Sequence, residues 1–132
     1  MSGIKGMAIG KTVNCGFDEA ITRVTDSLKN QGFGVLTEID VKQTLKDKIG
    51  ADFRRYKILG ACNPPFAHQA LMAELNVGLL MPCNVIVYET DDGSIQVTGF
   101  KPEAMLAAFD RKDLAEVAAQ LKLRMAAAIN GV

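Results

Sequence analysis

The chain lacks tryptophan and has a single histidine, His68, in its 132 residues. It also lacks net charge, because 15 Lys and Arg residues balance 15 Asp and Glu residues. Nucleic-acid binding usually needs a broad basic field, so we expect no nucleic-acid partner. No apolar run approaches the ~18 residues of a transmembrane helix, so we expect no membrane partner.

Cysteine is scarce and odd in number, which excludes a fully paired disulfide framework. In a reducing compartment Cys15, Cys62 and Cys83 are most simply free thiols. The first twelve residues lack the apolar core and the cleavage pattern of a secretory signal. We therefore expect a cytoplasmic protein.

Hydrophobic residues, in contrast, are abundant at 48%, which is enough for a sizeable core. The length is that of one ordinary domain, and no linker, repeat or low-complexity tract divides the chain. We therefore predict a single domain over residues 1–132.

Side-chain periodicity predicts five strands and several helices. Period-2 alternation and β-branched residues predict strands over residues 7–13, 33–41, 55–59, 84–89 and 94–100. Apolar residues at helical spacing predict two long helices, one from Phe17 to near Gly32 and one from Leu114 to Ile129. Short helices are predicted over residues 41–49, with Asp40 as the N-cap, and 64–75. Residues 102–109 fit either a short helix or a loop.

This order of elements predicts an α+β fold with a mostly antiparallel five-stranded sheet. Two long helices should cover one face, with short helical insertions between strands. Apolar residues fall on both faces of the predicted strands, so the second face must be solvated or buried by a partner. Together with zero net charge, this favours a homodimer.

Two carboxylates, Glu38 and Asp40, lie two residues apart on a predicted strand and therefore face the same side. Such a pair can share a proton or hold a cation. The alternative is a polar strand face in which Asp40 caps the following helix. We favour the alternative, because the capping chemistry fits the sequence well.

The corner GACNPPFAHQA, residues 60–70, is the main candidate site. Cys62 precedes a predicted helix start, where the helix dipole stabilises a thiolate. Asn63 suits the N-cap, with its side chain reaching the amide of Phe66, and Pro64 suits the first helical position. Cys83 lies in a similar corner, MPCNV. If the two strands concerned are neighbours, both thiols lie at the same end of the sheet.

Three chemical uses of this corner are open. Cys62, Cys83 and His68 can bind a metal such as zinc or copper. Cys62 and Cys83 can form a redox pair, and Cys62 can be a nucleophile with His68 as its base. The spacing matches no strong template, and a free cysteine often packs as a small hydrophobe, so a structural role is favoured.

Three segments resemble the DUF302 family, a bacterial and archaeal domain of unknown function: GFGVLTEIDV (32–41), YKILGACNPPFAHQAL (56–71) and GLLMPCNVIVYE (78–89). The resemblance covers nearly the whole chain. It implies a compact β-α-β(4)-α fold, similar to TATA-binding-protein-like domains, frequent dimerisation and no established activity. The signature positions that it implies are Glu38, Asp40, Cys62, Asn63, Pro64, Pro82 and Cys83.

We therefore predict an uncharacterised domain that binds a small ligand or metal near Cys62 and Cys83. Ligand-binding candidates are Cys62, Asn63, Cys83, Glu38 and Asp40, and metal-binding candidates are Cys62, Cys83 and His68. A thiol-dependent enzyme or redox protein that uses Cys62 is one alternative. A non-catalytic dimeric interaction module is the other.

Overall fold

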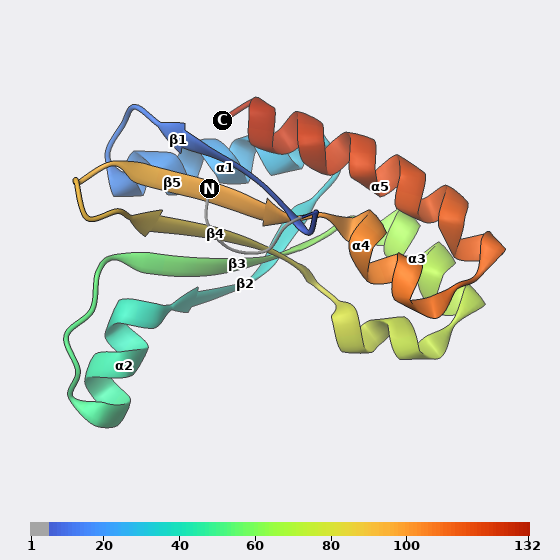
Figure 1. Cartoon of the computed structure of the whole chain (residues 1–132), viewed down its shortest axis with the longest axis horizontal. Coiled ribbons are helices and arrows are strands. Elements are labelled where there is room, and N and C mark those ends of the chain that lie inside the picture. Colours follow the sequence, from blue (N-terminus) through green and yellow to red (C-terminus); the bar gives the residue numbers. More distant parts are fainter. Residues whose placement is uncertain (1–5) are drawn as a thin grey trace.

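A computed structural model describes residues 6–132, apart from the side chains of residues 105 and 106. Residues 1–5, which begin the segment considered as a secretory signal, lie outside the described residues. Figure 1 shows one twisted sheet with helices packed on it. Its strands are β1 (Ala8–Val13), β2 (Gly34–Asp40), β3 (Tyr56–Cys62), β4 (Cys83–Glu89) and β5 (Ile95–Phe100).

The sheet is five-stranded and antiparallel, in the order β1-β5-β4-β3-β2. The predicted α+β class and the number of strands are thus confirmed. Strand β3 extends past its predicted end at residue 59 to Cys62. The Asp92-Gly93 turn joins β4 to β5, with Gly93 in the left-handed conformation that such a turn favours.

Two long helices are present as predicted, together with several shorter ones. The long helices are α1 (Phe17–Asn30) and α5 (Lys112–Asn130). The shorter ones are α2 (Val41–Ile49), α3 (Pro64–Ala73), the 3-10 helix η1 (Leu75–Leu80), α4 (Pro102–Leu106) and the 3-10 turn η2 (Ala107–Phe109). Helix α3 ends before its predicted limit at residue 75, because Glu74 is extended and its side chain caps η1. No helix in the described part of the chain is long and apolar enough to cross a membrane.

Helices α1 and α5 cover one face of the sheet, which we call the covered face. Alternation along the central strands directs Leu59, Val85, Val87 and Val97 to this face, where all four are fully buried. Apolar residues of both helices meet them, including Val24 and Leu28 of α1 and Met125 and Ile129 of α5. Each such side chain contributes about 1.5–3 kcal/mol by leaving water. The hydrophobic core of the domain therefore lies between this face and the helices.

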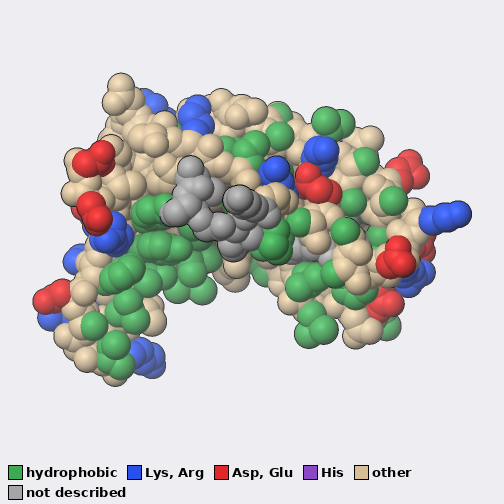
Figure 2. Space-filling model, viewed as in Figure 1, with side chains coloured by type: hydrophobic (Ala, Val, Ile, Leu, Met, Phe, Trp, Pro, Cys, Tyr) green, Lys and Arg blue, Asp and Glu red, His purple; other side chains and the backbone are tan. Residues whose placement is uncertain are grey.

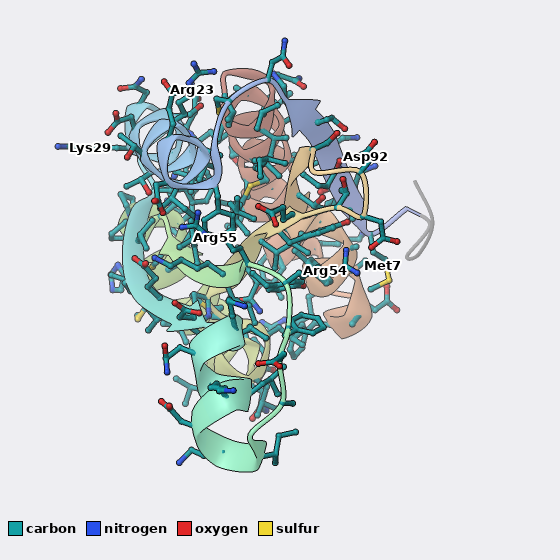
Figure 3. The ribbon with its side chains drawn as sticks, turned by 90° about the vertical axis from the view of Figure 1, so that its left-hand side faces the viewer. Met7, Arg23, Lys29, Arg54, Arg55 and Asp92 are labelled. Atoms are coloured by element: carbon teal, nitrogen blue, oxygen red, sulfur yellow. The ribbon has the colours of Figure 1, made fainter. Side chains whose placement is uncertain are left out.

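On the opposite side of the sheet, which we call the open face, residues 6–132 form no such helical layer. Its strand residues include Tyr56, Ile58, Ile86, Tyr88 and Phe100, which are half-buried. The rings of Tyr56 and Tyr88 stack across the β3–β4 pair with centroids 5.3 Å apart. Figure 3, in which the molecule is turned by 90°, shows α1 on one side of the sheet and α2 extending below it.

Helix α2 projects from the sheet at the β2 edge (Figure 1). The Asp40 carboxylate accepts a hydrogen bond from the Gln43 amide at 2.9 Å, which confirms the predicted N-cap. The helix ends at Gly50, whose φ of 66° requires the left-handed conformation. None of its residues is buried. Local capping therefore stabilises α2 more than tertiary packing does.

Candidate functional site

The two cysteine corners meet at one end of the sheet. Strand β3 ends at Cys62, and its neighbour β4 begins at Cys83. In the antiparallel register Ala61 is the partner of Cys83, so the two cysteines lie diagonally across adjacent strands. Both line one cavity of about 30 Å³.

The wall of this cavity is apolar and is built from several elements. The segments that contribute are the start of β2, the β3–α3 corner, the start of β4 and helix α5. Besides the two cysteines and Asn63, the lining includes Phe33, Phe66, Ala70, Met81, Pro82 and Leu121. None of the described residues that line it is charged or is a histidine. The cavity is therefore a small apolar space that both cysteine residues line.

Burial controls the protonation of both thiols. It raises the pKa of Cys62, and it raises the pKa of Cys83 to about 11, with a smaller contribution from the charge of Cys62. The sequence suggested the opposite for Cys62, since a helix N-terminus stabilises a thiolate. The apolar wall outweighs the dipole of α3 here. Both thiols are protonated at neutral pH.

Asn63 occupies the N-cap position of α3 as predicted, but its side chain does not cap the helix. The side chain is buried, and its Nδ2 donates a hydrogen bond to the carbonyl oxygen of Gln31 at 3.1 Å. Gln31 is the C-cap of α1, so this bond joins the end of one helix to the start of another. The expected bond to the Phe66 amide is therefore replaced by a tertiary one.

Arg124 of α5 is a residue that sequence reasoning missed. Its guanidinium lies 5.3 Å from the ring centroid of Phe66 and donates from Nη1 to the Gln31 carbonyl at 3.3 Å. These contacts hold α1, α3 and α5 together beside the cavity. The available signal was a single arginine within the mainly apolar segment LKLRMAAA.

Met81 is a second residue that was missed, although it adjoins the predicted corner. It lines the thiol cavity, and together with Pro82 it also lines a hollow of about 270 Å³ on the open face. The peptide bond between Met81 and Pro82 is cis. A methionine directly before the Pro82-Cys83 pair was the available signal, because its thioether is a soft donor.

His68 is not part of the cavity. It lies on α3, is exposed, and is absent from the residues that line the space. Within residues 6–132, no group of three or more His, Cys, Asp or Glu side chains is placed to hold a metal ion. The predicted three-ligand set of Cys62, Cys83 and His68 is therefore not assembled, because the sole histidine points away from the thiols.

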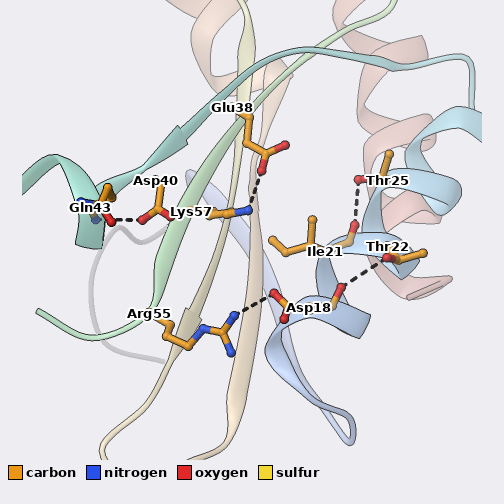
Figure 4. A network of polar contacts seen from close by, with 9 residues as sticks. All are labelled: Asp18, Ile21, Thr22, Thr25, Glu38, Asp40, Gln43, Arg55 and Lys57. Atoms are coloured by element: carbon orange, nitrogen blue, oxygen red, sulfur yellow. Dashed lines mark hydrogen bonds and ion pairs between the residues drawn. The ribbon is translucent and has the colours of Figure 1, made fainter.

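Glu38 and Asp40 also lie away from the cavity. In the β2–β3 register they pair with Leu59 and Lys57, whereas Cys62 pairs with Gly34 at the other end of β2. Figure 4 shows Glu38 in an ion pair with Lys57, at 2.7 Å, and Asp40 bonded to Gln43. Their positions agree with a polar strand face and a helix cap.

Arg54, Arg55 and Lys57 form a basic cluster around the start of β3, and acidic side chains pair with its members. Arg55 forms an ion pair with Asp18 of α1 at 2.7 Å, and Arg54 forms one with Asp91 of the β4–β5 turn at 2.8 Å. In Figure 3 the two labelled arginines extend from neighbouring positions toward different parts of the molecule. The cluster therefore does not form one basic patch.

Comparison with known proteins identifies the family of this chain and similar solved structures. The model of the DUF302 family, a domain of unknown function, matches residues 9–132. The crystal structure of an uncharacterized conserved protein DUF302 from Bacillus stearothermophilus is 35% identical, with a TM-score of 0.85. The alignment covers 93% of this chain and 95% of that chain. No curated protein matches the sequence.

Proposed function

We propose a function for this chain, which belongs to the DUF302 family: the domain binds a thiophilic metal ion in the cavity between Cys62 and Cys83. One observation carries the proposal. Two cysteine residues from separate corners of the sequence line the same small, uncharged space. In this proposal, the domain binds and carries a metal ion and does not transform a substrate.

The size and chemistry of the cavity favour monovalent copper over zinc. A volume of about 30 Å³ suits an ion better than an organic ligand. Two thiols, with the thioether residue Met81 beside them, form a soft donor set of the type that selects Cu(I). Structural zinc sites take four protein ligands, and His68 does not supply a third one here.

Protonation links metal binding to pH. A thiol must lose its proton to bind the metal, and burial raises the pKa of both Cys62 and Cys83. Each ion bound at neutral pH therefore displaces protons. We expect the apparent affinity to increase as the pH rises from about 6 to 8, because proton competition weakens.

The test is an anaerobic titration of the untagged protein with Cu(I), in competition with a chromogenic Cu(I) chelator. We expect one equivalent to bind, and we expect Cys62→Ser to lower the affinity at least tenfold. Met81→Leu, which nearly conserves volume, should weaken binding by a smaller factor. Cys15→Ser is the matched control and should bind like the natural chain. A Cys62→Ser variant with full affinity, or a natural chain that does not retain one equivalent, would contradict the proposal.

The thiol-dependent alternative has less support in the geometry. An activated cysteine needs a lowered pKa or an adjacent base, whereas burial raises the pKa of Cys62 and His68 lies outside the cavity. Its test is the alkylation rate of Cys62 by iodoacetamide at pH 7. A rate well above that of free cysteine would favour the enzyme or redox alternative over metal binding.

A second proposal concerns the oligomeric state of the domain, and it is based on the apolar side chains of the open face. This face presents half-buried aromatic and aliphatic side chains that no described helix covers. Exposed apolar surface of this kind marks interaction sites, so we propose that the domain is a homodimer in the cytoplasm. Light scattering at micromolar concentration should give twice the monomer mass of 14.2 kDa. The monomer mass would contradict it.

A further inference from the structure

Helix α2 has an apolar stripe that the other described residues cover only in part. Val41, Leu45 and Ile49 recur every four residues and therefore share one side of the helix. None is buried, and the Ile49 side chain at the tip is 73% exposed. An amphipathic helix normally buries such a stripe. We call this projecting helix the α2 arm.

At the end of the open face that is opposite to the α2 arm, there is a groove. Like the stripe of the arm, this groove is mainly apolar. Leu79 and Leu80 of η1, Met81, Pro82, Asn84 and Phe100 line it, with a volume of about 270 Å³. We call it the η1 groove. Leu79 is 83% exposed, which is unusual for a leucine. Asn84 and Phe100 are open-face positions of β4 and β5, so the groove opens on the same side as the Tyr56–Tyr88 stack.

The arm and the groove lie at opposite ends of the strands. Phe53, which follows the arm, contacts the ring of Tyr56 near the start of β3, whereas the groove adjoins the start of β4 beside the end of β3. Figure 2 shows two lobes with a hollow between them and hydrophobic side chains along its walls. In Figure 1 these lobes correspond to α2 and to the region of α3 and η1.

We propose that the open face is where two copies of this chain meet, with the α2 arm of each copy seated in the η1 groove of the other. A two-fold axis that lies in the interface and runs across the strands exchanges the two ends of the face. This symmetry therefore forms two equivalent contacts, each between the α2 arm of one copy and the η1 groove of the other. Because both contacts are satisfied in a pair, the assembly closes as a dimer. This inference rests on the proposed homodimer and specifies its geometry.

The exposed apolar residues on this surface supply part of the area that a second copy would bury. Fully burying one large aliphatic side chain removes on the order of 100 Å² from water. Five exposed residues would thus contribute roughly 300 Å² per copy; they are Ile39, Ile49, Phe53, Leu79 and Leu80. The half-buried side chains of β3, β4 and β5 add to this. A stable interface needs about 800 Å² per partner.

The charge distribution also permits self-association. The formal net charge of the chain is zero, so two copies do not repel each other at long range. The open-face residues of the central strands β3, β4 and β5 are uncharged, including Ile58, Ile86 and Thr98. Face-to-face docking therefore brings no like charges together at the centre of the interface. Charged side chains at the centre of an interface would oppose such a pairing.

Three single variants test whether this surface forms the dimer. Ile49→Lys in the arm and Leu79→Glu in the groove should each weaken dimerisation at least tenfold, as measured by analytical ultracentrifugation. Leu123→Glu is the matched control, since Leu123 is 65% exposed on α5, away from the open face, and should leave the dimer intact. Circular dichroism should show all three folded, because each replaced side chain is exposed.

A double variant tests the pairing of arm with groove. In the Ile49→Lys/Leu79→Glu chain, each new lysine meets a new glutamate of the other copy, so the dimer should return. If two arms met each other instead, like charges would face and the chain would stay monomeric.

The outcomes separate this inference from the dimer itself. A monomeric natural chain would overturn both. A natural dimer that the single variants leave intact would overturn this interface alone, and a monomeric double variant would overturn the arm-to-groove pairing.

Discussion

The two faces of the sheet are made from alternate residues of the same strands, yet they differ in what covers them. On β3, Leu59 points to the covered face and is fully buried, while its neighbour Ile58 points to the open face and is only partly buried. On β4, Val85 and Ile86 differ in the same way. Both faces are apolar, so composition alone does not distinguish them.

The difference lies in the helices. Helices α1 and α5 supply apolar stripes that fill the covered face, and the thiol cavity lies at one end of that packed layer. On the other side, α2 extends from the β2 edge (Figure 1), and no helix of the described residues packs on the centre of the open face. One face thus forms the fold and encloses the candidate site, and the other face is available for a partner.

The largest expected effect comes from neighbouring substitutions that compare the two faces. Leu59→Ala should lower the free energy of unfolding by about 2–5 kcal/mol, because it leaves a cavity in the core. Ile58→Ala should cost less than half as much, since Ile58 already contacts solvent. Urea denaturation gives both values. Equal losses at low protein concentration would show that the open face is packed within a single chain.

The second prediction concerns the pH dependence of Cys83, whose pKa burial raises from 9.0 to about 11. Between these pH values the unfolded chain loses the thiol proton while the folded chain keeps it. Stability is therefore fully present below pH 9 and decreases as the pH rises toward 11, by on the order of 1–3 kcal/mol. Burial and the charge of Tyr88 raise the pKa of Tyr56, which adds a loss of the same sign.

Urea titrations from pH 8 to pH 11 measure this effect as a difference between the natural chain and Cys83→Ala. The variant should be less stable at pH 8 but should lose less stability as the pH rises. Identical slopes for the two proteins would show that Cys83 is not desolvated in the folded state.

A smaller effect is expected at the joint between α1 and α3. Asn63→Ala removes the hydrogen bond to the Gln31 carbonyl, and we expect a loss of about 1 kcal/mol. The loss stays modest because Arg124 also donates to that carbonyl. Combining it with Arg124→Met should therefore cost more than the sum of the two single changes. Strict additivity in a double-mutant cycle would contradict this shared role.

The smallest effect is expected at the sheet edge, where Glu38 pairs with Lys57 in a partly exposed position. Glu38→Gln should change stability by less than ~1 kcal/mol, and the difference should shrink in 1 M salt. Thermal melts at low and high salt measure it. The same variant should bind Cu(I) with the affinity of the natural chain. A lower affinity for Cu(I) would show that Glu38 contributes to metal binding.

Local chemistry made much of the fold predictable. The cap at Asp40, the glycine at position 50 and the Asp92-Gly93 turn each act over a few residues, and the structure has the Asp40 cap where it was predicted. Asn63 shows the limit of such reasoning. Its position at the helix start was predictable, but the partner of its side chain, the Gln31 carbonyl, is distant in sequence and depends on how α1 packs.

The candidate site was predictable only in part, for the same reason. Cys62 and Cys83 were identified from two similar sequence corners. The prediction that they lie at the same end of the sheet held only if β3 and β4 are neighbouring strands. His68 is close to Cys62 in sequence but lies on the exposed side of α3, and Met81 was found only through the cavity that it lines. Spacing along the chain does not determine which side chains share an enclosed space.

The sequence by itself determined the class of fold, the length and order of most elements, and the two thiol corners, because these depend on periodicity, capping and turn chemistry within short segments. Only the tertiary structure decided that the two corners share one cavity, that burial keeps their thiols protonated, and that no described helix covers one face of the sheet. Strand order and helix packing bring together residues far apart in the sequence. Desolvation, which sets the chemistry of the thiols, exists only after that packing.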